Sequence, residues 1–256
     1  MKIATPISHL FKDKEWAERI IASSDCLECR DHTIDYNYHG QEVFHSDLQP
    51  IHIWRQKEVN YLLDIKKRKT DLKLISFHLA TCFDNPTIEN HKFVAGGRKL
   101  LPEELLSNAI INLNKAKEIL GANVLLAIEN NNNLGTEAYD YVTEPDFINT
   151  VINKNNIWFL FDIAHARISS FYKKMSFEKY ANLLPLDRTI QIHISRYGYN
   201  DQNEMIDAHE LPGENEIGEV KVLLAKYKCI KYLTVEYYKD IEHLLVFLNL
   251  VRKELV

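Results

Sequence analysis

The sequence predicts a (β/α)8 TIM barrel, and three observations lead to this prediction. Eight short apolar segments have the length and composition of β-strands, and segments with apolar residues at helical spacing alternate with them. Strands that alternate with helices run parallel to one another, and eight of them close naturally into a barrel. A chain of 256 residues with 46% hydrophobic composition can bury one large core, so we expect a single domain over residues 1–256.

The first half of the chain departs from regular alternation at one place. Strands are expected at residues 2–7, 26–31, 42–48 and 72–80, and helices at residues 13–24 and 57–69. A polar and aromatic segment, residues 31–40, separates the second strand from the third. The second helix of the barrel is therefore expected to be short or missing.

The second half is more regular. A helix over residues 102–121 is indicated by Pro102 at a favoured first position and by Gly121 at a favoured stop. Further strands are expected at residues 123–130, 157–166, 188–195 and 232–238, and further helices at residues 144–154, 176–185, 216–227 and 240–255. The near-continuous apolar run over 157–166 is typical of a strand buried on both faces. The segment Thr81 to Leu100 is expected to be an irregular loop over the barrel mouth.

Histidines and carboxylates occur at or just after the ends of most of these strands. The candidates are His45, His78, Glu129, Asp162, His165, His193, Asp207, His209 and Glu236. All are ligand types suited to zinc, iron or manganese. The segments that follow the strands of a barrel open at one end, so these side chains are expected to converge there. Asp207 and His209, in the loop after the seventh strand, are two residues apart and should lie on one side of an extended segment.

The apolar surroundings of the carboxylates favour a metal centre. Glu129, Asp162 and Glu236 each end an apolar strand, where an unpaired carboxylate would lose its hydration at high cost. Divalent cations would compensate for that loss. The alternative is a barrel that uses the same groups as an ion-paired acid/base site. Any one of these histidines alone would more often be an ordinary hydrogen-bonded residue, so the prediction depends on the whole set.

Three neighbouring residues are candidates for substrate binding. Asn130 directly follows Glu129, and it could hold a ligand carboxylate or contact substrate. Ser195 and Arg196 lie just past His193, and Arg196 is the candidate anchor for an anionic substrate group.

The cysteines and the net charge disfavour a cysteine metal site and an overall attraction to nucleic acid or membranes, and they leave a local basic patch open. The four cysteines are expected to be buried thiols, because Cys26 and Cys29 would point to opposite faces of a strand and are poorly placed to share a metal. A formal net charge of −5 gives no overall attraction to nucleic acid or acidic membranes. No segment approaches the roughly 20 apolar residues of a membrane span, and the opening segment lacks the apolar core of a secretory signal. We therefore expect a cytoplasmic protein with no membrane association.

With its strand ends in place, the chain resembles the xylose-isomerase-like TIM-barrel superfamily over nearly its whole length. One similar branch is the endonuclease IV family of abasic-site phosphodiesterases, through LAIEN, FDIAHA, IHIS, DAHELPGENEIG and TVE. That resemblance implies a three-metal site. His45, His78 and Glu129 would hold the first metal; Glu129, Asp162, His193 and Glu236 the second; and His165, Asp207 and His209 the third.

A second branch comprises the multinuclear non-haem iron enzymes of the methanobactin-oxidase type. The chain resembles them through ISFHLA, KLLPEELLSNAIINLNKAKEILGANVLLAIENN, TEPDFI and YANLLPLDRTIQIHIS. These stretches extend beyond the ligands, which makes this resemblance the more specific of the two. Against it, DAHELPGENEIG is closer to the phosphodiesterase pattern, and FDIAHA has a histidine where some relatives carry asparagine.

The favoured resemblance implies an oxygen-dependent iron enzyme that modifies a cysteine in a peptide substrate, with a small protein delivering that peptide. It implies two or three metal ions, iron before zinc or manganese, with Glu129, Asp162 and Glu236 taking part in catalysis. A trinuclear zinc phosphodiesterase acting on abasic DNA is the alternative, although the acidic charge and the truncated second connection make nucleic acid the less favoured partner. A sugar isomerase or epimerase with one metal, and a barrel that binds without turnover, remain further alternatives.

Overall fold

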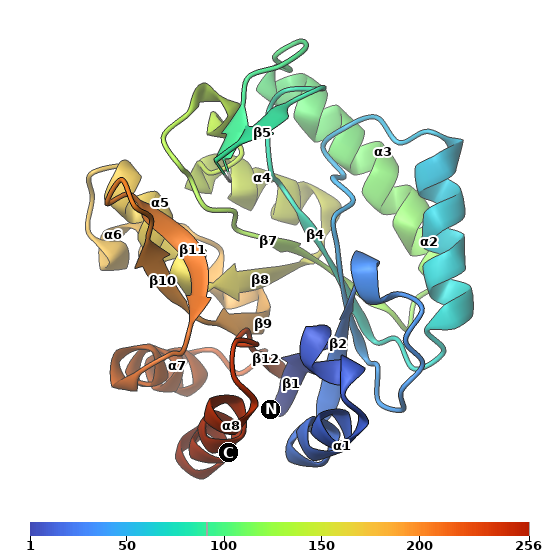
Figure 1. The fold of residues 1–256 in the computed structure, drawn as a ribbon. Coiled ribbons are helices and arrows are strands. Elements are labelled where there is room, and N and C mark those ends of the chain that lie inside the picture. Colours follow the sequence, from blue (N-terminus) through green and yellow to red (C-terminus); the bar gives the residue numbers. More distant parts are fainter. Residues whose placement is uncertain (91, 256) are drawn as a thin grey trace.

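Eight apolar strands pair in parallel and close into a barrel, as the sequence predicts (Figure 1). The structure is a computed structural model that describes residues 1–90 and 92–255. Around the barrel the strands follow the order β1-β12-β9-β8-β7-β4-β3-β2, and β2 pairs with β1 to close it. The barrel strands are β1 (Lys2–Pro6), β2 (Cys26–Arg30), β3 (Val43–Ser46), β4 (Leu74–His78), β7 (Leu125–Glu129), β8 (Trp158–Asp162), β9 (Thr189–Ile194) and β12 (Tyr232–Val235).

Helices surround the strands (Figure 1). They are α1 (Lys14–Ser23), α2 (Gln56–Arg68), α3 (Pro102–Leu120), α4 (Pro145–Asn155), α5 (Ile163–Tyr172), α6 (Phe177–Leu183), α7 (Glu214–Lys226) and α8 (Ile241–Leu255). Between β2 and β3 the chain forms only a short 3-10 turn, η2 (Asp31–Thr33), so the expected loss of the second helix is confirmed. Within the two described ranges, none of the helices is both long and apolar enough to cross a membrane.

The apolar run over residues 157–166 is a strand followed by a helix, not one strand as expected. The strand ends at Asp162, whose carboxylate accepts a hydrogen bond of 2.7 Å from the backbone N–H of His165 and thereby caps α5. Both elements are buried, so their apolar runs merge in the sequence and periodicity cannot separate them. His165 therefore projects from the first turn of a helix.

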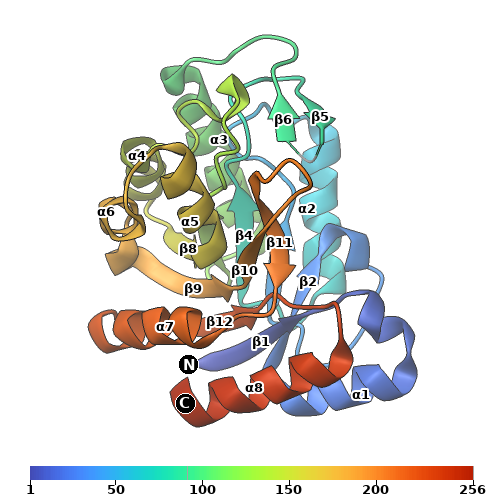
Figure 2. The same cartoon turned by 60° about the vertical axis from the view of Figure 1, so that its left-hand side comes forward.

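Two segments expected to be loops contain β-hairpins. Within the Thr81–Leu100 segment, β5 (Thr87–Glu89) pairs antiparallel with β6 (Lys92–Val94). After β9, β10 (Arg196–Tyr199) pairs antiparallel with β11 (Met205–Glu210). Figure 2 shows both hairpins as arms separate from the barrel strands. Asp207 and His209 lie on β11, so a strand of the second hairpin holds them, where the sequence predicted a loop.

One apolar layer fills the inside of the barrel. Each of the eight strands contributes one buried residue to it: Ala4, Cys26, Val43, Leu74, Ala127, Leu160, Ile190 and Tyr232. The larger core lies between the strands and the helices and includes Cys29. Cys26 and Cys29 thus belong to different faces of β2, as their spacing predicts. The inner layer is the floor on which the candidate site is built.

Candidate metal centre

Polar side chains lie directly beyond the apolar floor because side chains of a strand face the same side at every second residue. Two residues after the floor, β2, β3, β7 and β8 carry Glu28, His45, Glu129 and Asp162. Four residues after it come Arg30 on β2, His78 on β4 and Glu236 after β12. On β9, a register shift in the pairing with β8 places His193 opposite Asp162. The alternation of the strands therefore builds a polar cluster at the carboxyl end of the barrel.

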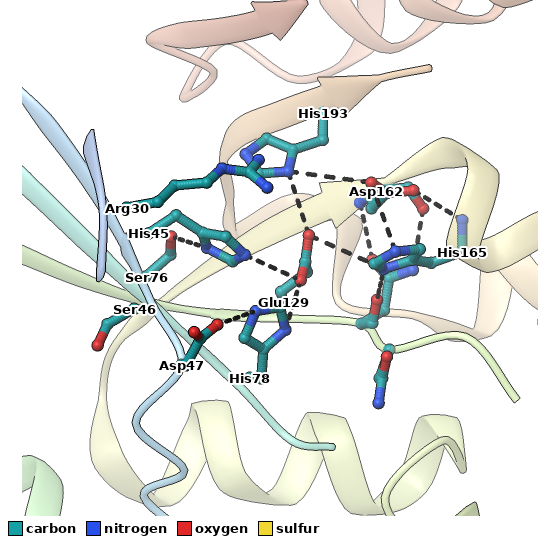
Figure 3. Close-up of polar contacts among 12 residues, drawn as sticks. Arg30, His45, Ser46, Asp47, Ser76, His78, Glu129, Asp162, His165 and His193 are labelled. Atoms are coloured by element: carbon teal, nitrogen blue, oxygen red, sulfur yellow. Dashed lines mark hydrogen bonds and ion pairs between the residues drawn. The ribbon is translucent and has the colours of Figure 1, made fainter. Parts of the chain in front are cut away.

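Glu129 lies between four histidines. Its Oε2 atom is 2.9 Å from His78 Nδ1 and 3.4 Å from His45 Nε2. Its Oε1 atom is 3.2 Å from His193 Nδ1 and 3.9 Å from His165 Nδ1. Figure 3 shows the carboxylate with His45 and His78 on one side and His193 and His165 on the other. The two oxygens of one carboxylate thus face different pairs of histidines.

The other predicted ligands complete a ring from His193 back to His165. His193 Nδ1 lies 3.3 Å from Glu236 Oε1, and Glu236 Oε2 lies 3.6 Å from His209 Nε2. Asp207 Oδ2 is 3.3 Å from His209 Nε2 and 3.2 Å from His165 Nε2. Residues from β9, β11, α5 and the position directly after β12 therefore meet.

Asp162 joins the same ring. Its Oδ2 atom lies 3.9 Å from His193 Nδ1 and 4.0 Å from His165 Nε2. With it, each of the nine candidates has a nitrogen or oxygen atom within 4.0 Å of another member: His45, His78, Glu129, Asp162, His165, His193, Asp207, His209 and Glu236. The structure thus brings together every residue that the sequence singled out as a ligand.

The donor atoms fit metal ions in two respects: the distances between them, and the absence of hydrogen-bond partners for several buried atoms among the described residues. Two donors about 2.0–2.2 Å from one ion at tetrahedral or octahedral angles are roughly 3–3.5 Å apart, close to the separations in the ring. Glu129 Oε2, Asp162 Oδ2, His193 Nδ1 and Asp207 Oδ1 are buried without a hydrogen-bond partner among the described residues. Buried polar atoms are normally satisfied, so unpartnered atoms gathered in one place indicate a missing bound group. Three sets of residues have donor atoms within 4.8 Å of one another: His45, His78 and Glu129; Glu129, Asp162 and His165; and Glu28, His193 and Glu236.

Burial and the neighbouring charges shift the pKa values of several groups in the cluster. Burial would raise the pKa of Glu129, but His45, His165 and His78 outweigh it and hold that pKa well below its ordinary value. Burial lowers the pKa of His45 to about 4, so this imidazole is neutral and able to bind a metal. Burial and the nearby carboxylates Glu129 and Asp207 raise the pKa of Asp162 to about 6. Such opposite shifts in a small volume are typical of functional sites.

Glu28 is a buried residue of the site that the sequence analysis missed. Its Oε2 atom accepts hydrogen bonds from Gln191 Nε2 at 2.7 Å, from Thr234 Oγ1 at 3.1 Å and from His193 Nε2 at 2.9 Å. Its Oε1 atom accepts from Arg30 Nη2 at 3.0 Å, and Arg30 also contacts Glu236. Both oxygens are thus engaged, so Glu28 is better suited to orient His193 than to bind a metal.

Glu28 fixes which nitrogen of His193 faces the cluster. Because Nε2 is directed at Glu28, Nδ1 is left pointing at Glu129 and Glu236. Burial would lower the pKa of His193, but Glu28 and Glu129 outweigh it and raise that pKa to about 9. Ser76 does the equivalent for His45: its Oγ lies 2.7 Å from Nδ1, which leaves Nε2 directed at Glu129.

The three predicted substrate-binding residues lie in different environments. The side chain of Asn130 is fully buried; its amide donates to the carbonyl of Asp162 and accepts from the N–H of Asp162, both at 2.9 Å. Asn130 therefore positions the backbone of Asp162, whereas the sequence analysis expected it to hold a ligand carboxylate or to contact substrate. Ser195 is buried, with its hydroxyl unpartnered among the described residues. Arg196 is exposed and lines a pocket whose lining contains none of the nine candidate ligands, so its role as an anchor for an anionic substrate group stays a prediction.

Comparison of the sequence with models of known protein families shows the family of the chain. The sequence model of the RiPP precursor modification enzymes MbnB/TglH/ChrH matches residues 33–247. The chain belongs to this family. The resemblance to peptide-modifying enzymes of the methanobactin-oxidase type is thereby confirmed. A comparison with curated proteins gave no match.

Solved structures of xylose-isomerase-like barrels share the fold. D-psicose 3-epimerase from Clostridium cellulolyticum H10 is 14% identical, with a TM-score of 0.62, and the match covers 100% of this chain and 99% of the epimerase. SacUVDE is 12% identical, with a TM-score of 0.57 and coverage of 99% and 98%. L-ribulose 3-epimerase is 14% identical, with a TM-score of 0.54 and coverage of 100% and 86%. At identities this low, the similarity confirms the barrel fold and is not evidence for a particular reaction.

Proposed function

We propose that this protein is a multinuclear non-haem iron enzyme that uses oxygen to modify a cysteine in a ribosomally made peptide. The family supports peptide modification. The observation that carries the metal assignment is Glu129, whose two oxygens face different pairs of histidines. A carboxylate in that position can bridge two ions.

The ring divides into three ligand sets around this bridge. His45, His78 and one oxygen of Glu129 would hold the first ion. The other oxygen of Glu129 would hold the second ion, together with Asp162, His193 and Glu236. The remaining set, His165, Asp207 and His209, would hold a third. Imidazole and carboxylate ligands suit iron, zinc and manganese alike, and the family resemblance favours iron.

Charge balance favours two firmly bound ions. The four ligand carboxylates, Glu129, Asp162, Asp207 and Glu236, carry four negative charges, which two divalent cations neutralise. The charge of Glu28 is already offset by Arg30. A third divalent ion would leave excess positive charge in a buried site, and an anionic thiolate from the substrate would reduce it. We therefore propose that occupancy of the third set depends on substrate.

The protein groups would hold the reacting centre and keep water from it. Bound iron would supply redox chemistry with oxygen and would ligate the substrate thiol, which loses its proton readily on coordination. Glu129, Asp162 and Glu236 are the proposed catalytic residues because all three face the ring and are nearly fully buried. Asn130 and Glu28 would keep Asp162 and His193 in position. A small partner that delivers the peptide completes the proposal.

The test is metal analysis and oxygen uptake on protein purified without oxygen. We expect two to three iron ions per chain, and oxygen uptake that requires a cysteine-containing peptide. Glu129→Gln should lose or weaken at least two ions together. Glu210→Gln is the matched control, because Glu210 follows His209 on β11 but pairs with Lys239 at the surface. Zinc-only protein without peptide-dependent oxygen uptake would contradict the proposal.

A zinc phosphodiesterase is the second candidate, because His165, Asp207 and His209 are linked as a third set would require. Two arginines that could bind phosphate are already paired, Arg98 with Glu104 and Arg167 with Glu219. Cleavage of an abasic duplex with zinc or manganese present would favour this candidate over the iron enzyme.

A further inference from the structure

A cavity of about 380 Å³ lies beside the metal centre, between the ends of β1 and β2 and the segment after β12. Its lining includes His9, Lys12, Arg30, His32, Tyr36 and Tyr238. We propose that this cavity binds a carboxylate of the peptide substrate, close to the residue that is modified. The inference rests on the proposed function, since it names a chemical feature of that substrate.

The charge of the lining favours an anion. Lys12 and Arg30 are positively charged, and the imidazoles of His9 and His32 can donate hydrogen bonds to an anion. No Asp or Glu is among the lining residues of this cavity. Lys12, His9 and His32 form no ion pair with any part of the chain that the structure describes. A protein of net charge −5 thus has two cationic side chains, the unpaired Lys12 and the partly paired Arg30, on a cavity beside its candidate active site.

Arg30 connects the cavity to the metal centre. Its side chain is 18% exposed, and its Nε and Nη2 atoms donate to Glu28 Oε1 at 3.3 and 3.0 Å. Nη2 also contacts Glu236, a proposed metal ligand. The Nη1 atom takes no part in the hydrogen bonds to Glu28, so its two N–H donors could serve a ligand. Figure 3 shows the guanidinium of Arg30 next to His193.

Tyr238 provides a second connection. Its ring lies 5.2 Å from the ring of His209, measured between centroids, so one wall of the cavity packs directly on another proposed metal ligand. A ligand between Arg30 and Tyr238 would therefore lie next to two members of the ring, Glu236 and His209. The volume suits one side chain or the end of a peptide, and Tyr36 and Tyr238 supply apolar contact for its carbon atoms.

A peptide offers carboxylates from two sources, an acidic side chain and its own C-terminus. Four fluorescein-labelled probes separate them: Gly-Gly-Cys-Asp-Gly-amide, the same peptide with Asn in place of Asp, and Gly-Gly-Cys with either a free or an amidated C-terminus. Binding is measured by fluorescence anisotropy on the iron-loaded protein without oxygen, so no turnover is needed. We expect one carboxylate probe to bind about tenfold more tightly than its neutral counterpart, with the preference falling at high salt.

Lys12→Gln tests the cavity without disturbing the buried Arg30 network, because Lys12 is exposed. The variant should lose most of the preference for the carboxylate while its affinity for the neutral probe is unchanged. Lys14→Gln is the control, since Lys14 lies two residues away with a side chain that is 92% exposed and is not in the lining. His32→Gln should reduce the preference as well, since His32 also lines the cavity.

The outcomes separate this inference from the proposed function. Equal affinity for charged and neutral probes overturns the carboxylate subsite, as does a loss on Lys12→Gln that is equal for both, or the absence of binding by all four probes. A protein that prefers the carboxylate probe but never consumes oxygen with any peptide keeps the subsite and loses the iron-oxygenase function. If charged and neutral peptides bind with equal affinity and support oxygen uptake at equal rates, the iron-oxygenase function is kept and the carboxylate subsite is lost.

Discussion

At the scale of single residues, the centre depends on groups that orient imidazoles as much as on the ligands themselves. His193 must present Nδ1 to the ring, and it does so because Nε2 is held by Glu28. Gln191 and Thr234 in turn hold Glu28, and all of these side chains are fully buried. A histidine held from behind loses little freedom when it binds a metal, which strengthens binding.

Glu28→Gln should therefore weaken metal binding by roughly 10- to 100-fold while the barrel still folds, since glutamine keeps the shape of the side chain. The affected donor is His193 Nδ1, whose orientation would no longer be fixed by a charged acceptor. The measurement is zinc affinity by competition with a chromophoric chelator. Glu42→Gln is the control because Glu42 pairs with Lys2 outside the site. An unchanged zinc affinity in Glu28→Gln would show that the orienting role is wrong.

At the scale of elements, two glycines show how helix ends and helix interiors differ. Gly121 ends α3 with a φ of +84°, a conformation that side chains with a Cβ rarely adopt. Gly218 lies within α7, and a Cβ added at either glycine would meet no atom within 4 Å. The space around the two positions is therefore equivalent, and only the backbone conformation distinguishes them.

Gly121→Ala should lower the free energy of unfolding by about 1 kcal/mol, and Gly218→Ala should raise it by about 0.5–1 kcal/mol. In the first variant alanine is forced into a left-handed conformation. In the second it restricts the unfolded chain and suits a helix. Urea denaturation of both variants beside the unmodified protein measures the difference. Changes of the same sign in the two variants would contradict this explanation.

In the segment between β3 and α2, His52 makes a contribution to the free energy of unfolding that depends on pH. The Nε2 atom of His52 lies 2.9 Å from the carbonyl oxygen of Thr81, and burial lowers the pKa of this imidazole from its ordinary 6.5. Below pH 6.5 the unfolded chain then binds more protons than the folded one, so stability falls as pH falls through that range. His52→Gln should remove this component. The difference in unfolding free energy between protein and variant should be constant from pH 8 to 7 and shrink towards pH 5.

At the scale of the whole molecule, strand alternation made the barrel predictable from the sequence. The candidate ligands could be picked out because Glu129, Asp162 and Glu236 end apolar strands, where a charged residue stands out. Glu28 could not be found in this way. It lies inside the segment CLECRD between two buried cysteines, and its partners Gln191 and Thr234 are more than 160 residues away. The only signal was one carboxylate within a short strand, and the same signal would fit an edge strand that exposes one face.

The hairpins were missed for a different reason. The strands β5 and β6 have three residues each, too few for a periodicity to show, and their side chains are exposed or only half-buried. The side chains of Asp207 and His209 on β11 approach to 3.3 Å, although the pairing of β11 with β10 shifts register there and His209 has a φ of +44°. That pairing also depends on a turn over residues 200–204 that has no strong sequence signature. Local pattern predicts which residues share a face and does not predict which segment pairs with which.

The buried charges also link the centre to the stability of the entire barrel. Asp162 lies close to the carboxylates of Glu129 and Asp207, and burial together with these charges raises its pKa to about 6. A folded-state pKa above the ordinary value of 3.8 means that ionisation of Asp162 costs stability as pH rises through 6. At pH 8 the metal-free protein bears this cost in full. Cations bound to the ring would remove it.

The effect of Asp162→Asn on the free energy of unfolding should therefore have opposite signs without metal and with metal. Without metal at pH 8, the variant should be more stable than the unmodified protein by about 1–3 kcal/mol, because asparagine is neutral and can still cap α5. With zinc at about 1,000 times its dissociation constant, the unmodified protein should gain roughly 4.1 kcal/mol, and the variant much less, so the order reverses. Thermal unfolding with chelator and with zinc measures both, with Glu210→Gln as the control that follows the unmodified protein. If the variant is less stable under both conditions, the carboxylates are not held at an electrostatic cost, and the ring owes its arrangement to hydrogen bonding alone.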